Sequence, residues 1–379
     1  MNFEFSEEQV MLRDSVARYV QDDYDWETRV AIAGSEAGID RAKWQTFAEL
    51  GWLSIPFAEE HGGFGGGPLD VMVVMEELGK GLVLEPYLAT VLLYGGLLQK
   101  GGSARQQEAR IPSIIDGSSL GAFAYLERQS RFETSDVLTT ATATDGGYAL
   151  NGEKVVVFNG ENADKLVVLA RTSGEQFDEH GLSLFLVDAN AQGVSKVLYP
   201  MMDAQRVANI TFNNVQLGAD ALLGDAGSAL DVVNEVIRDA LLALASEAVG
   251  IMGTLNAKTL EYTKTREQFG VAIGSFQALQ HRMVDTMMAF EQSKSLLFKA
   301  LCEYEIDPAS ADTTIHALKV LIDRNSKLVY GEAIQMHGGM GITDELDIGH
   351  YAKRLMMINA TLGDGSFHRS KFIEQTYAA

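Results

Sequence analysis

Cysteine is the scarcest residue of the chain, with Cys302 the single one among 379 residues. One cysteine cannot form an intrachain disulfide, so the sequence gives no sign of a fold built for an oxidising compartment. The seven histidines are scattered, with neither an HExxH pattern nor a Cys/His cluster, and a metal site therefore has no support. GxSxG, P-loop and GxGxxG patterns are also missing, which removes the commonest hydrolase and nucleotide-binding signals.

Basic residues are few, 30 Lys and Arg against 52 Asp and Glu, and the formal net charge is −22. A surface this negative repels the phosphates of nucleic acids and of anionic lipids, so we expect no nucleic acid and no membrane as partners. The N-terminal segment MNFEFSEEQV has no apolar run of the kind found in signal peptides. No uninterrupted apolar stretch approaches membrane-spanning length, and we expect a cytoplasmic protein.

The first part of the chain has a helical pattern that predicts an N-terminal helical domain over residues 1–119. Ser6 and Gln9 form a capping-box signature at its beginning. The glycines of Gly62–Gly67 cannot hold a helix, and Pro68 then starts another one. No strand leads into this glycine run, and it is not a GxGxxG. A flexible connection beside a ligand cleft and a plain structural turn both remain open.

Residues 120–223 change to a β-type pattern. Turn signals at Asp145–Gly147 and Asn151–Gly152 separate β-rich runs, and DKLVVLAR, LSLFLVDA and ANITFNNVQL follow as three further strands. Strands spaced so closely, without helices between them, predict an antiparallel sandwich or barrel.

Residues 224–379 return to a helical pattern, and the whole chain is therefore predicted to be an α+β protein. Apolar side chains at helical spacing predict one buried stripe along a long helix, with the methionines as core residues. This stripe consists of Leu279, Met283, Met287, Phe290, Leu297 and Leu301.

Three polar, glycine-containing segments in the C-terminal part are candidates for ligand contact. YTKTREQFG spans Tyr262–Gly270 and is followed by Phe276–Gln277; IQMHGGMG spans Ile334–Gly341. LGDGSFH spans Leu362–His368 and places a lone carboxylate, Asp364, between two glycines. Taken singly, the first two segments are more typical of an ordinary helix C-cap, and the third of a solvated turn, than of a ligand site.

Together these segments resemble the acyl-CoA dehydrogenase family, and the similarity covers essentially the whole chain. RxxFG, a nearby FQ, QxHGGxG and a terminal GDGS follow ALNGEKVVVFNGENADKLVVLAR in the family's order. The resemblance implies a C-terminal four-helix bundle, FAD as cofactor, an acyl-CoA substrate and electron-transfer flavoprotein or a similar acceptor. The segments AYLERQSRFETSD and GDGSFH are most similar to small subunits of heteromeric members such as pimeloyl-CoA dehydrogenase.

The resemblance also implies roles for individual residues. The family's catalytic base, a Glu before Gly-Thr, corresponds to Asp364 before Gly365-Ser366, which makes Asp364 the candidate base for the α proton. In the family, residues of two segments reach across a dimer interface to FAD. They correspond here to Arg266, Gln268, Phe269 and Gln277, and to Gln335, Gly338 and Gly339. Arg266 is expected to meet the diphosphate, because a guanidinium fork matches its oxygens.

Two departures from the family pattern lie in the β domain. The Thr-Glu-Pro segment that binds flavin in the family is here Leu126-Glu127-Arg128, followed by the bulky Arg131 and Phe132. The strand residue whose hydroxyl usually faces the flavin is Phe158, which has no side-chain donor. Ser366 retains the small hydroxyl of the terminal motif.

These departures leave several interpretations open. The chain is expected to work as a dimer or tetramer, either with a homologous subunit whose site it completes or with itself. We expect an enzyme that removes two hydrogens from an acyl-CoA. A non-catalytic subunit that clamps FAD, and a flavin-dependent oxidase or monooxygenase on the same scaffold, are the alternatives. A second position that some members use for the base corresponds to Ala240, one residue after Asp239.

Overall fold

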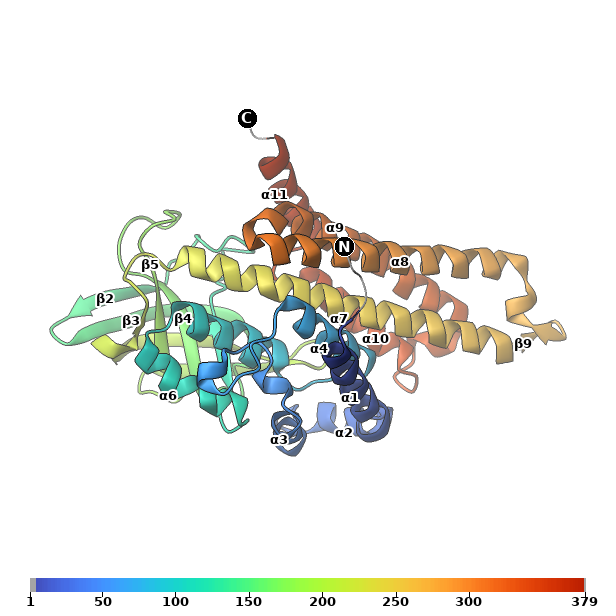
Figure 1. Ribbon diagram of the computed structural model, residues 1–379, viewed down its shortest axis with the longest axis horizontal. Coiled ribbons are helices and arrows are strands. Elements are labelled where there is room, and N and C mark those ends of the chain that lie inside the picture. Colours follow the sequence, from blue (N-terminus) through green and yellow to red (C-terminus); the bar gives the residue numbers. More distant parts are fainter. Residues whose placement is uncertain (1–4, 378–379) are drawn as a thin grey trace. The chain divides into compact units, whose positions relative to one another are not determined.

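The computed structural model describes residues 5–377 and has helices at both ends of the chain, with a β-sheet between them in sequence (Figure 1). This confirms the predicted α+β class with helical, β and helical regions in that order. Contacts divide the described chain into two compact units. The first unit contains residues 5–30, 68–83 and 241–377, and the second contains residues 31–67 and 84–240. Each unit therefore combines segments that are far apart in sequence.

The first unit is helical, and its central element is a helix that packs against three others: α9 contacts α8, α10 and α11. The capping box predicted at Ser6 is present, with its hydroxyl accepting a hydrogen bond from the backbone N–H of Gln9 at 3.2 Å. The elements with residues in this unit are α1 (Glu7–Asp23), part of α2 (Trp26–Gly34), α4 (Pro68–Lys80), most of α7 (Leu230–Thr265), β9 (Glu267–Gln268), β10 (Val271–Ala272), η5 (Ile273–Ser275), α8 (Gln277–Ile306), η6 (Pro308–Ala311), α9 (Asp312–His337), η7 (Gly338–Ile342), α10 (Ile348–Ala360) and α11 (Gly365–Tyr377).

The predicted apolar stripe of α8 is buried only in its C-terminal half. Leu297 and Leu301 are core residues. Met287, by contrast, is 47% exposed, and its neighbours Val284 and Met288 are exposed as well. The expectation that the methionines of this stripe are core residues is therefore wrong for Met287. Periodicity located the face, but the described residues cover its first half only in part: Leu279, Met283 and Phe290 are half-buried.

Helix α7 is the one described helix that is long and apolar enough to pass a membrane-span test by length and composition. Its most apolar window has a mean hydropathy of 1.4, although Glu247 interrupts it. Most of that window, 78%, is buried inside the protein. Burial of this extent is the property of a core helix, whose apolar surface is covered by other protein segments.

The second unit combines helices with an eight-stranded sheet in the order β6-β7-β3-β2-β4-β5-β8, with β1 beside β4. Most strand pairs are antiparallel, as predicted, but β1 and β2 both run parallel to β4. The strands are β1 (Gly121–Ala124), β2 (Thr140–Thr144), β3 (Gly147–Phe158), β4 (Lys165–Arg171), β5 (Leu182–Asp188), β6 (Val194–Pro200), β7 (Arg206–Gly218) and β8 (Leu222–Leu223). The helical elements are α3 (Arg41–Glu49), η1 (Trp52–Ser54), η2 (Glu59–His61), the π-helix η3 (Tyr87–Gly95), α5 (Gly96–Gly101), α6 (Ala104–Ile115) and η4 (Ala219–Ala221).

One of the two predicted turns in the β region is not a turn. Asp145 and Gly146 form the tight turn between β2 and β3, as predicted. Asn151 and Gly152, however, lie inside β3, where the register with β7 shifts between Leu150 and Gly152. Gly152 has φ +148°, and a Cβ there would meet the Thr139 hydroxyl at 2.4 Å. The Asn-Gly pair therefore marks a β-bulge with a close approach of Thr139, which also favours glycine.

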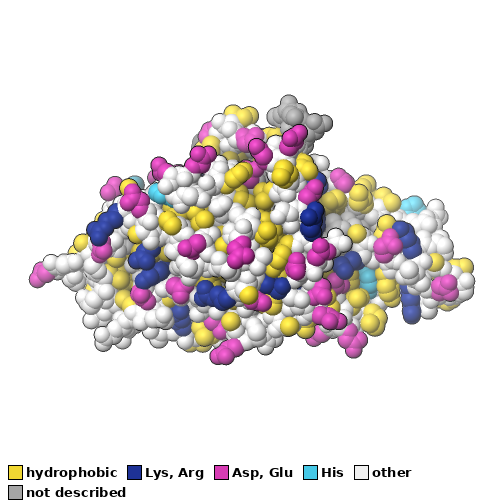
Figure 2. Space-filling view, turned by 60° about the horizontal axis from the view of Figure 1, so that its bottom comes forward, with side chains coloured by type: hydrophobic (Ala, Val, Ile, Leu, Met, Phe, Trp, Pro, Cys, Tyr) yellow, Lys and Arg dark blue, Asp and Glu magenta, His cyan; other side chains and the backbone are white. Residues whose placement is uncertain are grey.

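Charged side chains are spread over the surface. Figure 2 shows acidic side chains scattered across one face, with basic ones between them. Inside the first unit, the Glu247 carboxylate on α7 accepts two hydrogen bonds from the Arg354 guanidinium on α10, at 2.5 and 2.7 Å. This bidentate pair is buried and joins α7 to α10.

Candidate functional site

The end of α7 leads into a short, exposed hairpin that carries three of the predicted cofactor residues, Arg266, Gln268 and Phe269, and a fourth follows at the start of α8. α7 ends at Thr265, and β9 pairs with β10 so that the backbone N–H of Ile273 donates to the carbonyl of Arg266 at 2.8 Å. Phe269 stands at the tip with φ +56° and 92% of its surface exposed. Gln277 follows as the first residue of α8. The Gln268 amide donates to the carbonyl of Glu267, whereas Arg266 and Gln277 make no side-chain hydrogen bond among the described residues.

The glycine turn lies at the C-terminal end of α9. His337 is the last residue of this helix, and Gly338 has φ +61°, which favours glycine over residues with a side chain. A Cβ added to Gly338 or Gly339 would have no atom within 4 Å. Both glycines, and Gln335 before them, are exposed. The turn therefore presents open backbone that a ligand can approach.

These two segments meet at one end of the C-terminal helices. The Tyr262 ring on α7 stacks on the His337 ring on α9, with ring centroids 4.3 Å apart. The Arg282 guanidinium near the start of α8 forms an ion pair with Glu332 near the end of α9. The structure thus brings the hairpin, the start of α8 and the glycine turn into one neighbourhood, and among its described residues Arg266, Gln277 and Gln335 offer unengaged donors.

Asp364 is the N-terminal cap of α11. Its Oδ1 accepts hydrogen bonds from the backbone N–H groups of Ser366, at 2.9 Å, and Phe367, at 2.8 Å. This is the role that a short carboxylate side chain performs best at a helix start. Oδ2 accepts no hydrogen bond from the described residues and remains the oxygen that could take a proton. The glycine after Asp364 is required by space, since a Cβ on Gly365 would lie 2.6 Å from a carboxylate oxygen of Asp323.

A buried polar cluster surrounds the turn before Asp364, and sequence analysis did not identify it. The Lys319 ammonium donates to the carbonyls of Ile358, Asn359 and Gly363. His368 has a ring N–H that donates to the carbonyl of Leu362 at 3.0 Å. Lys319 lies on the buried side of α9, between Ile315 and Ile322 at helical spacing. A lysine flanked by apolar residues at this spacing was the signal that could have revealed it.

The candidate base and the cofactor segments are far apart within one chain. Lys319, which contacts the turn before Asp364, and Gln335 both lie on α9, separated by sixteen residues (335 minus 319). At about 1.5 Å per residue this separation is roughly 24 Å along the helix. Asp364 and the glycine turn of the same chain therefore cannot both touch one small reacting group.

Phe158 ends β3 in the second unit and is buried. It packs with Ala89 and Val207, and Val156, Tyr199 and Met201 lie against this cluster. The next residue, Asn159, has φ +57° and is buried, and its side-chain amide donates to the Thr90 hydroxyl at 3.4 Å. At this strand end the side chain is thus part of the apolar core and offers no hydroxyl.

The segment that departs from the family's flavin-binding pattern is organised around a buried ion pair. The Glu127 carboxylate is 2.7 Å from the Lys154 ammonium and accepts hydrogen bonds from the backbone N–H groups of Leu138 and Thr139. Burial opposes the charge of Glu127, but Lys154 and the hydrogen bonds hold the pKa of this carboxyl at about 2. Arg128 lies outside this arrangement and pairs with Glu153 on the surface.

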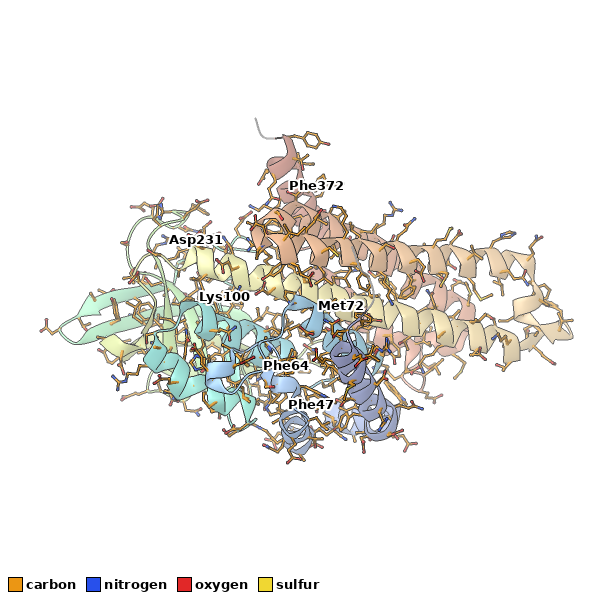
Figure 3. All side chains as sticks on the ribbon, viewed as in Figure 1. Phe47, Phe64, Met72, Lys100, Asp231 and Phe372 are labelled. Carbon is orange, nitrogen blue, oxygen red and sulfur yellow. The ribbon has the colours of Figure 1, made fainter. Side chains whose placement is uncertain are left out.

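The second possible base position has no free carboxylate. Ala240 is fully buried in α7 and has no ionisable group. Asp239 lies one residue earlier, and its carboxylate is 3.0 Å from the ammonium of Lys100, which is labelled in Figure 3. The same ammonium also contacts Glu235 at 3.4 Å. Asp364 therefore remains the better candidate base.

Three family models match successive parts of the chain: acyl-CoA dehydrogenase N-terminal domain over residues 6–118, middle domain over residues 122–215 and C-terminal domain over residues 230–375. The chain belongs to the acyl-CoA dehydrogenase family. A probable acyl-CoA dehydrogenase of Bacillus subtilis, YngJ, is 28% identical over 359 residues, with 92% of each chain covered.

Solved structures of the family have the same fold over the whole length. A structure described as PigA with FAD and proline has a TM-score of 0.91 and 25% identity, with 99% of each chain covered. The ChsE4–ChsE5 complex of Mycobacterium tuberculosis has a TM-score of 0.90 and 26% identity, covering 100% of this chain and 99% of the other.

FAD is the cofactor of this family, and the residues of the hairpin and glycine turn fit it. A diphosphate needs cationic and N–H donors together with close backbone approach. The free guanidinium of Arg266, the free amides of Gln277 and Gln335, and the open space at Gly338 and Gly339 meet this need.

Proposed function

We propose that the chain is a subunit of an FAD-dependent acyl-CoA dehydrogenase, which converts an acyl-CoA thioester into the 2-enoyl-CoA. FAD, when bound, accepts the hydride that leaves the β carbon of the acyl group. Asp364 takes the α proton on Oδ2, while Oδ1 stays hydrogen-bonded to the start of α11. The two backbone N–H bonds fix the carboxylate orientation, because a rotation about its side-chain bonds would break both.

The observation that carries the proposal is the distance of about 24 Å along α9 between the Asp364 turn and Gln335. It supports an assembly in which Arg266, Gln277, Gln335, Gly338 and Gly339 hold the FAD of a neighbouring chain. Gln268 and Phe269 lie on the same hairpin and are assigned to the same contact. Asp364, with Ser366 beside it, acts in the chain's own site.

We further infer that the neighbouring chain is a homologous subunit of different sequence, in a cytoplasmic heterotetramer. Phe158 fills apolar space in this chain, and Leu126 and Arg128 stand where the family has Thr and Pro. Both features would weaken the chain's own flavin contacts, whereas the residues assigned to a neighbour's FAD follow the family pattern. The similarity to ChsE4–ChsE5, a complex of two named chains, supports the same arrangement. Electron-transfer flavoprotein or a similar carrier would reoxidise the FAD.

The deciding experiment measures FAD per chain after purification of the protein alone and after co-expression with the product of the adjacent gene. We expect weak occupancy alone and recovery with the partner. Arg266→Ala should lower FAD affinity about tenfold or more, because a charge-assisted contact is worth about 1.5–3 kcal/mol. Lys264→Ala is the matched control, since Lys264 is exposed and pairs with Glu261 on the same helix end. A homo-oligomer with one tightly bound FAD per chain would contradict the heteromer, and unchanged affinity in Arg266→Ala would contradict the site.

Two other functions have specific support. The first is a non-catalytic subunit that only clamps FAD. It is supported by Asp364 Oδ1, which caps α11, because capping alone explains a carboxylate at this position. The fold is also that of a prolyl acyl carrier protein oxidase, AnaB, with a TM-score of 0.91, so the same scaffold is compatible with an oxidase. Oxygen consumption without an added electron acceptor would identify the oxidase, and unchanged turnover in Asp364→Asn would identify the clamp.

A further inference from the structure

Lys319 is a fully buried lysine, and among residues 5–377 its ammonium has no carboxylate within hydrogen-bonding distance. Only 2% of the residue is exposed, and its three N–H donors are directed at three backbone carbonyls, of Ile358 at 2.6 Å, Asn359 at 3.2 Å and Gly363 at 2.9 Å. Burying an ammonium is costly, so a lysine in this position needs a complete set of acceptors. Burial lowers the pKa of Lys319 to about 7, although Asp323 and Asp364 oppose this shift.

The three carbonyls belong to two different pieces of backbone. Ile358 and Asn359 are in the last turn of α10, where helix carbonyls lack the regular intrahelical partner. The Ile358 carbonyl also accepts a backbone hydrogen bond from Thr361, at 3.2 Å. Gly363 immediately precedes Asp364. The Lys319 side chain therefore connects the end of α10 to Gly363, the residue immediately before Asp364.

The backbone between these two pieces is strained. Leu362 has φ +57° and Gly363 has φ +114°, so two successive residues adopt a left-handed conformation. For leucine this conformation costs about 1–2 kcal/mol. The His368 ring donates to the carbonyl of Leu362, and a Cβ on Gly363 would lie 2.4 Å from the same ring. The turn keeps this shape because Lys319 and His368 hold it from the buried side.

We propose that Lys319 is a positioning residue for Asp364: its ammonium holds the strained turn at Leu362–Gly363 in the one shape that sets Asp364 against the acyl group. This inference rests on the proposed function in one respect, the assignment of Asp364 as the base. The contacts by which Lys319 and His368 hold the turn at Leu362–Gly363 do not depend on that assignment, and they are tested separately. Loss of the ammonium removes the hydrogen bond to the Gly363 carbonyl. The backbone next to Asp364 should then become more mobile.

The matched control is Lys327, two turns further along α9. It pairs with Asp323 at 2.8 Å and touches none of the three carbonyls. Lys327→Met removes a full positive charge from the same helix near the same turn, whereas Lys319 is only partly charged near pH 7. Any effect of charge alone on Asp364 should therefore occur in both variants, whereas an effect of the hydrogen bonds should occur in Lys319→Met only.

The first measurement is hydrogen exchange of the full chain, followed by mass spectrometry of peptides covering residues 355–370. We expect exchange in this segment to become at least about tenfold faster in Lys319→Met and to stay unchanged in Lys327→Met. Lys319→Gln, which keeps two donors, should be intermediate, and it serves if Lys319→Met does not fold. Unchanged exchange in both Lys319 variants would overturn the proposal.

The second measurement is the rate of flavin reduction in the assembled, FAD-loaded protein at saturating acyl-CoA. The probes are butyryl-, octanoyl- and glutaryl-CoA, of which the fastest is used. A displacement near 1 Å can cost about a hundredfold in rate. We expect a loss of at least tenfold in Lys319→Met, with acyl-CoA affinity and FAD content retained. Lys319→Met should cause no further loss in an Asp364→Asn background, because Asn preserves the helix cap but removes the base.

The outcomes separate the two levels of inference. Full activity in Lys319→Met beside an inactive Asp364→Asn overturns the positioning role and leaves the proposed function intact. Full activity in Asp364→Asn overturns the base assignment and the positioning role together. A further loss in the double variant overturns the claim that Lys319 acts through Asp364.

Discussion

Replacing Lys154 by methionine should leave the buried Glu127 carboxylate of the second unit without its cationic partner. Lys154 is fully buried on β3, and its ammonium donates to Glu127 Oε1 at 2.7 Å and to the carbonyl of Tyr125 at 3.0 Å. Methionine keeps most of the volume but removes the charge. Glu127 then retains only neutral donors, including the backbone N–H groups of Leu138 and Thr139.

Two routes give the size of the effect. Breaking a buried ion pair by removing one partner typically costs about 3–5 kcal/mol. The pKa of Glu127 provides a second figure, since it lies at about 2 in the folded protein against 4.5 for the free group. That difference corresponds to about 3 kcal/mol of stability, most of it from Lys154. Because the folded pKa is the lower one, this contribution is complete above about pH 4.5 and is lost as the pH falls towards 2.

Hydrogen exchange at increasing urea concentration is the suitable assay, because it reports the opening free energy of β3 in a protein with more than one compact unit. Lys165→Met is the control, since the Lys165 ammonium is 2.8 Å from Asp188 in a more exposed pair of the same sheet. It should cost less than about 1 kcal/mol. The double variant Lys154→Met/Glu127→Gln should recover part of the loss, because it removes the unpaired buried charge. The amide oxygen can accept only one of the two backbone N–H groups, which bind different carboxylate oxygens in Glu127. Equal costs for Lys154→Met and Lys165→Met would refute the reasoning.

Further predictions concern a buried histidine and a glycine. Burial, with Lys319 and His316 nearby, lowers the pKa of His368 to about 3, so the unfolded chain binds a proton below pH 6.5 that the folded protein does not. The free energy of unfolding, measured by urea titration, should therefore fall by about 2 kcal/mol between pH 7 and pH 5. His368→Gln should show a clearly smaller decrease. Gly152→Ala should destabilise β3 by about 1–3 kcal/mol through its clash with Thr139, while Gly146→Ala, with open space around it, should cost less than about 0.5 kcal/mol in the same exchange assay.

The order of the elements could be predicted from the sequence because it depends on local periodicity. The capping box at Ser6, the restart at Pro68 and the turn after Asp145 are decided by neighbouring residues and were predicted correctly. Strand β6, Val194–Pro200, was missed. Its residues are either half-buried or exposed and none is fully buried, so the segment has no clear apolar face. Asn151–Gly152 was misassigned because the same dipeptide suits a turn and a bulge, and only the approach of Thr139 distinguishes them.

The candidate site was predictable to a different degree. The motif residues at Arg266 and Gly338 were located by resemblance, and their common neighbourhood follows from the antiparallel course of α7, α8 and α9. The surroundings of Asp364 were not predictable. Lys319 and His368 reach its turn from positions 45 and 4 residues away in sequence (364 minus 319, and 368 minus 364), and nothing local indicates that their side chains converge.

The interleaved course of the chain has a consequence for its synthesis. In the first unit, the Tyr351 hydroxyl donates to the carbonyl of Lys80 across a sequence separation of 271 residues. At about 5–20 residues per second, a ribosome needs roughly 15–55 s to deliver the second partner after the first. Until then α4, with Val71, Val73 and Val74, has α1 beside it but not α10, which carries Tyr351. The contact between α4 and α10 therefore cannot form until most of the chain has been made.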